Sequence, residues 1–259
     1  MTKPNTPDDP STHMPLIAHL VELRQRIMRA LLAMLIVFFG LVYFANDIYD
    51  IVSKPIRDQL PEGVTMIATD ITATFFAPIK LTLVVAFFLA MPVVLHQAWR
   101  FVSPGLYAHE KKFAIPLLII SVVLFYSGVA FAHLVIFPVM MEFFAHAGPQ
   151  ATLTPDISLY LAIALKLFFA FGLAFEIPVF TMLLVWSGVT TVNDLKQKRP
   201  YVIVFCFIFG MLLTPPDPFS QSMLAIPMCL LFEFGLLMSR MVVTRKQADA
   251  EEENSAAES

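Results

Sequence analysis

Four acidic residues lie in or beside long apolar stretches, where a carboxylate is costly to place. Glu22 precedes the first stretch, Glu110 lies in a polar segment between the second and third, and Glu176 lies within the fourth. Asp217 belongs to a proline-rich turn before the last stretch. Two carboxylates on one membrane face are suited to bidentate binding of guanidinium groups. Glu22 and Glu110 therefore form a candidate site for an arginine-containing ligand.

Glu22 and Glu110 each also have a simpler explanation. Glu22 can pair with Arg26, four residues later on the same helix face, which stabilises a helix by only about 0.2–0.5 kcal/mol. Glu110 is followed by Lys111–Lys112 and can offset their charge. Neither acid alone requires a ligand, so the hypothesis depends on the two acting together.

The other two acids raise a different question. A charge at the centre of a bilayer costs at least ~2.5–3.5 kcal/mol, which makes Glu176 a candidate functional residue. Its alternatives are a protonated carboxyl or a pair with Lys166, although the two residues are ~15 Å apart along one helix axis. Asp217 directly precedes Pro218, so a helix N-cap explains this acid as well as a functional role does.

The sequence contains no recognisable catalytic motif. It has no His-Glu-x-x-His zinc motif, no Gly-x-Ser-x-Gly nucleophile elbow and no glycine-rich phosphate loop. The six histidines lack metal-ligand spacing. Cys206 and Cys229 lie in apolar runs and are expected to behave as small hydrophobic residues. We therefore expect no enzyme, no metal and no cofactor, and the net charge of −3 does not indicate nucleic acid binding.

Membrane helices are the elements that must position these residues. Of the 259 residues, 58% are hydrophobic and 14% are charged, against about a quarter charged in an ordinary soluble domain. The apolar runs reach the ~20 residues that a helix needs to cross a bilayer. We expect a disordered segment over residues 1–14, one transmembrane domain over 15–240 and a disordered acidic cytoplasmic tail over 241–259.

The predicted fold is an all-α membrane protein with six transmembrane helices. An amphipathic helix that begins at Pro15 is expected to lie at the interface before the first span. The fourth span is too long for one upright crossing of a ~30 Å core, so we expect a tilt or a kink at Pro178. The fifth covers only ~20 Å. The expected spans are residues 29–45, 75–98, 113–141, 157–188, 201–213 and 219–239.

Basic residues predict the orientation. They precede the first span, separate the second from the third and the fourth from the fifth, and follow the sixth. The three intervening loops hold only Lys54 and Arg57. By the positive-inside rule, both termini are expected in the cytoplasm.

Five segments, in this order along residues 15–240, resemble the TatC family of the twin-arginine protein translocase. They are His19–Arg26, Phe101–Glu110, Phe168–Pro178, Lys198–Tyr201 and Met211–Asp217. The resemblance implies a core receptor subunit of the bacterial inner membrane, with a concave membrane face, that binds the twin-arginine signal peptides of folded export substrates. It implies transport driven by the proton-motive force. The implied partners are the single-span subunits TatA and TatB, membrane lipid and further copies of the chain.

The resemblance also assigns roles by position, and it leaves Lys166 without one. The residues implied to bind the signal peptide are Glu22, Glu110, Arg24, Phe101 and His109. The implied functional polar residues are Glu176, inside the concave face, and Asp217, in the last outer turn. The residues implied to dock TatA and TatB are Met211, Thr214 and Gln221.

A small-solute or ion transporter is the main alternative. It would use Glu176 and Lys166 as an intramembrane relay. Such transporters are typically built from internal repeats with helices that break near the bilayer midplane, and the two halves of this sequence show no convincing similarity.

Overall fold

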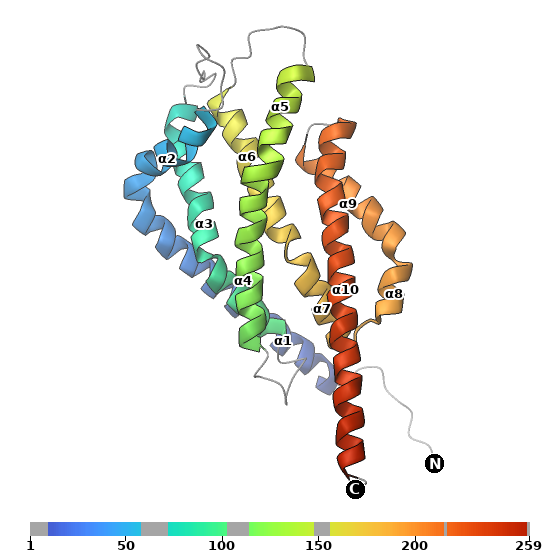
Figure 1. The fold of residues 1–259 in the computed structure, drawn as a ribbon. Helices are drawn as coiled ribbons and strands as arrows, with labels where there is room; N and C mark the ends of the chain where they lie inside the picture. Colours follow the sequence, from blue (N-terminus) through green and yellow to red (C-terminus); the bar gives the residue numbers. More distant parts are fainter. Residues whose placement is uncertain (1–9, 58–71, 103–113, 148–155, 215–216, 258–259) are drawn as a thin grey trace.

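The computed structural model describes residues 10–57, 72–102, 114–147, 156–214 and 217–257, which form a bundle of helices (Figure 1). A sixth apolar helix, Arg199–Leu213, is shorter than the five segments that are long and apolar enough to cross a membrane. Those five segments are Leu20–Val52, Phe75–Phe101, Ile115–Phe143, Ser158–Trp186 and Pro218–Met241.

Several of the expected spans consist of more than one helical element. In chain order, the elements are α1 (Pro10–Leu41), the 3₁₀ turn η1 (Val42–Phe44), α2 (Ala45–Arg57), α3 (Ala73–Val102), α4 (Ala114–Phe131), the π-helical turn η4 (Ala132–Ile136), α5 (Phe137–Ala147), α6 (Ile157–Ala174), α7 (Ile177–Trp186), α8 (Val192–Gln197), α9 (Arg199–Leu213) and α10 (Pro218–Ala257).

The two ends of the chain are more helical than the sequence suggested. The amphipathic stretch and the first span form one continuous helix, because no proline or glycine interrupts residues 16–39. This helix begins at Pro10, a residue type favoured in the first helical turn. At the other end of the chain, α10 continues to Ala257 through residues rich in Ala and Glu, which favour helices.

The fourth span breaks where a kink was predicted. Helix α6 ends at Ala174, a turn at Phe175–Glu176 follows, and Pro178 lies in the first turn of α7. Proline lacks a backbone N–H and its ring clashes with the preceding turn, so α6 cannot continue through it. The predicted kink is therefore confirmed. The predicted shortness of the fifth apolar helix is also confirmed, since the 15 residues of α9 extend only ~22 Å.

Two glycines allow the helices on either side of this break to approach closely. A Cβ on Gly128 of α4 would overlap the carbonyl oxygen of Phe171 on α6 and lie 2.9 Å from its carbonyl carbon. A Cβ on Gly235 of α10 would overlap the hydroxyl of Thr181 on α7 and lie 2.8 Å from the Cα of Pro178. Small residues at such crossings let membrane helices pack backbone to backbone. Helices α6 and α7 are thus fixed between α4 and α10.

The remaining helices lie on two sides of this centre. Figure 1 shows α1, α2 and α3 on one side and α8, α9 and α10 on the other. Helix α1 packs along α3, and α9 packs along α10. The first turns of α1, the end of α3, the start of α4 and the last turns of α10 all lie at the same end of the bundle (Figure 1).

We expect Gly235→Ala to destabilise the protein by about 1–3 kcal/mol, because the added methyl group has no space against α7. The matched control is Gly40→Ala, since a Cβ there meets nothing within 4 Å. Thermal unfolding of the detergent-solubilised variants measures the difference. Equal Tm values for the two variants would show that α7 and α10 are not packed as closely as described.

Candidate functional site

Glu22 keeps part of its carboxylate accessible on α1. The guanidinium of Arg26 contacts Glu22 through both Nε and Nη2, with Nε donating to Oε1 at 3.1 Å. The pair predicted from the four-residue spacing is therefore confirmed. The Arg26 side chain is 11% exposed, whereas the Glu22 side chain is 37% exposed. Arg26 thus packs against the protein and offsets part of the charge, while Glu22 remains accessible.

The other members of the predicted signal-peptide site are only partly described. Arg24 is exposed on α1, and Phe101 is half-buried in the last turn of α3. Glu110 and His109 lie outside the described residues. The helices that flank their segment, α3 and α4, end and begin at the end of the bundle where α1 starts (Figure 1). Glu22 and Arg24 lie in the fourth turn of α1, which packs along the helix α3 that carries Phe101 in its last turn.

Glu176 lies at the break between α6 and α7, next to polar groups from two other helices. The buried Ser121 of α4 is positioned to donate a hydrogen bond from its hydroxyl to the Glu176 carboxylate. Trp99 of α3 donates from Nε1 to the Ser121 Oγ at 3.0 Å. The Oε1 atom of Glu176 is buried and has no hydrogen-bond partner among the described residues. One carboxylate thus joins a polar chain across three helices and retains an unused acceptor.

The sequence did not indicate Trp99 or Ser121 as partners of Glu176. Tryptophan near a membrane surface is typical of the interfacial belt, and a single serine in an apolar helix commonly bonds to its own backbone. Their relation to Glu176 depends on the way α3, α4 and α6 pack.

Lys166 forms no ion pair with Glu176. It is exposed on α6, and no ion pair involves it within the part of the chain that the structure describes. The transporter hypothesis requires a relay between Glu176 and Lys166, and the structure shows no direct ion pair between these two residues.

Asp217 caps the N-terminus of α10. Its Oδ1 accepts a hydrogen bond from the backbone N–H of Ser220 at 2.7 Å, and Pro218 is the first residue of the helix. This is the capping geometry that the sequence offered as the structural explanation. The Oδ2 atom is buried without a hydrogen-bond partner among the described residues.

The three residues assigned to partner docking differ in accessibility. Met211 is 59% exposed at the end of α9. Thr214 is buried, and its hydroxyl donates to the carbonyl of Gly210 at 2.9 Å. Gln221 is half-buried and donates from Nε2 to the carbonyl of Phe207 at 2.9 Å, which joins α10 to α9. Only Met211 presents most of its side chain to the surroundings, and the other two shape the contact between the helices.

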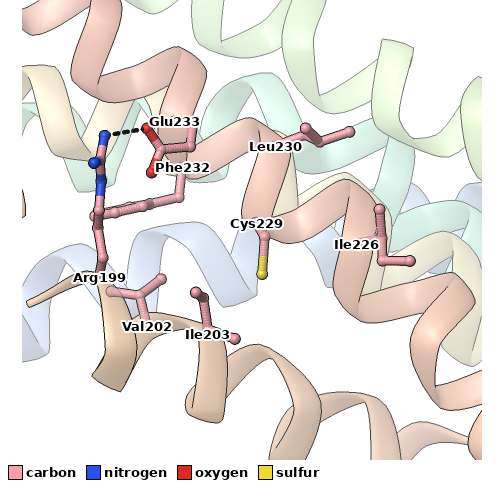
Figure 2. Close-up of a pocket in the computed structure, with 8 residues that line it drawn as sticks. All are labelled: Arg199, Val202, Ile203, Ile226, Cys229, Leu230, Phe232 and Glu233. Atoms are coloured by element: carbon pink, nitrogen blue, oxygen red, sulfur yellow. Dashed lines mark hydrogen bonds and ion pairs between the residues drawn. The ribbon is translucent and has the colours of Figure 1, made fainter.

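A further pair of charges joins α9 to α10. Arg199 donates from Nη2 to Oε2 of Glu233 at 2.6 Å, and the pair lies at one edge of a cavity between the two helices (Figure 2).

The fold and these residues define a multi-span helical membrane protein with carboxylates in the first helix, at a helix break and at the start of the last helix. Its chemistry is that of a binding or transport protein. The family model for the Sec-independent protein translocase protein (TatC) matches residues 18–227, and the chain belongs to this family.

Similar proteins cover almost the whole chain. TatC of Azotobacter chroococcum is 55% identical over 243 residues, which is 93% of this chain and 95% of that protein. TatC of Escherichia coli K12 is 52% identical over 230 residues, 88% of this chain and 89% of that protein. A crystal structure of the twin-arginine translocase receptor TatC is 38% identical, has a TM-score of 0.79 and covers 87% of this chain and 99% of that one.

These comparisons settle the coarse function. The chain is a translocase subunit of the Tat system, it works in a complex with other Tat components, and its relatives are translocase proteins rather than enzymes. The multi-span helical architecture matches that of the solved relative.

We expect Asp217→Ala to destabilise the protein by about 0.5–2 kcal/mol, because the first turn of α10 loses its cap. Asp217→Asn is the matched control, since asparagine caps as well as aspartate. Chemical or thermal unfolding in detergent compares the two. If Asp217→Asn lowered the stability as much as Asp217→Ala does, the stabilising feature would be the negative charge and not the cap.

Proposed function

We propose that this chain is the subunit that binds the twin-arginine signal peptides of folded proteins at the cytoplasmic face of the bacterial inner membrane. The observation that carries the proposal is the accessible carboxylate of Glu22, on the helix α1 that packs along α3, after which the segment containing Glu110 begins. Membership of the TatC family supports the same conclusion, because a solved relative is a twin-arginine translocase receptor.

The chemistry favours arginine over lysine as the ligand. A guanidinium group is always charged, and its planar fork matches the two oxygens of a carboxylate, whereas an ammonium group is a point charge. Two acids for two consecutive arginines set one register of the peptide. Phe101 would add an aromatic surface on which a guanidinium group can stack, and Arg24 and His109 would complete the patch.

The orientation follows from the basic loops and the positions of the two termini. With lysine and arginine concentrated at one end, the positive-inside rule places that end in the cytoplasm. The start of α1 and the last turns of α10 lie at that same end (Figure 1), which supports six spans with both termini inside. Glu22 then faces the compartment in which export substrates fold.

Glu176 provides a polar site for the part of the signal peptide that enters the membrane. The proposed path for its apolar segment is the concave face, along which α6 and α7 run. Oε1 of Glu176 is buried and has no hydrogen-bond partner among the described residues. Once uncovered by the entering peptide, it would accept a hydrogen bond from a peptide group that has left water, since unsatisfied backbone groups in a bilayer each cost several kcal/mol.

Helix α9 is the proposed docking surface for TatA and TatB. Within it, only Cys206 and Gly210 are buried, so most of its apolar side chains face outward. Met211 lies at the end of this surface, and Thr214 and Gln221 hold the adjoining turn in place. Assembly of these subunits with several copies of the chain, driven by the proton-motive force, would complete the export complex.

We expect Glu22→Gln and Glu110→Gln each to weaken binding of a twin-arginine signal peptide by about tenfold or more, and the double variant to weaken it further. Each change removes one charge-assisted hydrogen-bond acceptor, worth about 1.5–3 kcal/mol. Site-specific crosslinking and titration with a fluorescent peptide in lipid nanodiscs measure the effect.

Two controls make this test specific. Glu142→Gln changes an exposed acid near the end of α5, away from the start of α1, and should leave binding unchanged. A peptide in which the arginine pair is replaced by lysines should bind weakly to every variant. Unchanged affinity in the double variant would falsify the assignment of Glu22 and Glu110.

A further inference from the structure

A cavity of about 300 Å³ lies between the start of α9 and the middle of α10. Figure 2 shows Arg199 and Glu233 together at one end of this cavity, with Cys229 and Ile226 farther along α10. Apolar groups form most of its wall. The lining residues are Arg199, Val202, Ile203, Ile226, Cys229, Leu230, Phe232 and Glu233.

The cavity is open to the surroundings of the bundle. Three of its lining residues, Ile203, Ile226 and Leu230, are 47%, 55% and 64% exposed. Phe232 is 5% exposed and closes the inner side. Because these residues lie in or next to membrane-spanning helices, the opening faces the lipid phase.

At the polar end of the cavity, Arg199 has N–H donors that its bond to Glu233 does not use. Arg199 uses Nη2 for its bond to Glu233, and its Nε is buried without an acceptor among the described residues. A guanidinium group has five N–H donors. The side chains of Arg199 and Glu233 are 43% and 46% exposed, so the pair borders the opening and a second anion can approach it.

The charges near this end are mostly basic. Lys196 and Lys198 immediately precede Arg199 at the start of α9. Arg240 lies seven residues after Glu233 and therefore on the same side of α10. Among the described residues of α8, of the start of α9 and of α10 near Glu233, the acids are Glu233 and Asp194. Thr191 holds the Asp194 carboxylate with hydrogen bonds in the capping box of α8 and thereby lowers the pKa of Asp194. A negatively charged group at the opening thus meets more positive than negative side chains.

We propose that this cavity binds an anionic phospholipid, with the phosphate at Arg199 and one acyl chain along Val202, Ile226 and Cys229. Basic pockets between transmembrane helices on the cytoplasmic side are typical binding sites for anionic lipid head groups. A transmembrane helix of a partner is ~10–12 Å wide with its side chains and does not fit a cavity of about 300 Å³. A flexible acyl chain does. This lipid site is independent of signal-peptide binding.

The lipid would hold the short helix α9 against α10. Helix α9 packs mainly on α10 and leaves most of its surface exposed. An acyl chain in the cavity extends the contact between the two helices at the end where the ion pair already joins them. The binding site therefore stabilises the surface that α9 presents to other subunits.

The test measures lipids retained by the full-length protein. The chain is purified from nanodiscs that contain equal amounts of phosphatidylglycerol and phosphatidylethanolamine, and bound lipid is counted by native mass spectrometry. We expect wild type to retain one phosphatidylglycerol in at least threefold preference over phosphatidylethanolamine. Equal retention of the two lipids would overturn the proposal.

Charge variants separate phosphate binding from a purely structural ion pair. Arg199→Gln combined with Glu233→Gln keeps two side chains that can hydrogen-bond and removes both charges, and should abolish the threefold preference. Glu233→Gln alone keeps the guanidinium and removes the competing carboxylate, so retention of phosphatidylglycerol should stay the same or rise. A fall in the single variant to the level of the double variant would overturn the phosphate assignment.

Volume variants test the acyl-chain site without changing charge. Ile203→Trp fills the cavity and should reduce retained phosphatidylglycerol at least threefold. Ile208→Trp is the matched control, because Ile208 is 60% exposed on α9 and does not line the cavity. Equal retention by the two variants would show that the lipid binds elsewhere. Elution of both variants as wild type in size-exclusion chromatography establishes that they fold.

Discussion

The arrangement of this protein depends on close backbone contacts made by the fourth span, which is broken into α6 and α7. One neighbouring helix packs closely against each half. Gly128 lets α4 reach the backbone of α6, and Gly235 lets α10 reach that of α7. Burial of apolar area drives little association between helices in a bilayer, because lipid tails are as apolar as the side chains, so close packing and hydrogen bonds decide which helices associate. These two contacts hold the α6–α7 segment in place.

The fixed break explains why a carboxylate is tolerated inside the membrane region. The turn at Phe175–Glu176 directs the Glu176 side chain toward Ser121, which in turn accepts from Trp99. A polar group in the bilayer needs such partners. The site is therefore a property of three helices together, and within the described residues one carboxylate oxygen of Glu176 stays buried without a hydrogen-bond partner.

Other polar residues near the membrane connect structure to assembly. Asp217 caps α10, and Gln221 joins α10 to a backbone carbonyl of α9. At the start of α9, beside the middle of α10, Arg199 and Glu233 form an ion pair next to the cavity (Figure 2). Helix α9 is thus held to α10 near both ends while its outer surface remains uncovered. A subunit that must bind other subunits in the membrane needs such a surface.

The sequence alone predicted the main features that depend on local chemistry. The apolar runs predicted the helices, Pro178 predicted the break in the fourth span, and the four-residue spacing predicted the Glu22–Arg26 pair. Asp217 before Pro218 predicted a cap. Each of these depends on residues within about one helical turn of each other. The family could also be assigned from the order of five short segments. Helices α1 and α10 extend beyond the spans expected from the apolar runs, because residues without prolines or glycines can continue a helix.

Only the tertiary structure decided which distant residues meet. Ser121 lies 22 residues from Trp99 in the sequence, and Arg199 lies 34 residues from Glu233. A single sequence does not determine how one apolar helix is rotated against another. Nearly all faces of these helices are hydrophobic, so the spacing of the residues does not show which face packs against a neighbour. The network around Glu176 and the cavity beside Arg199 therefore arise from helix packing. The charges themselves, and their depth along each helix, were already determined by the sequence.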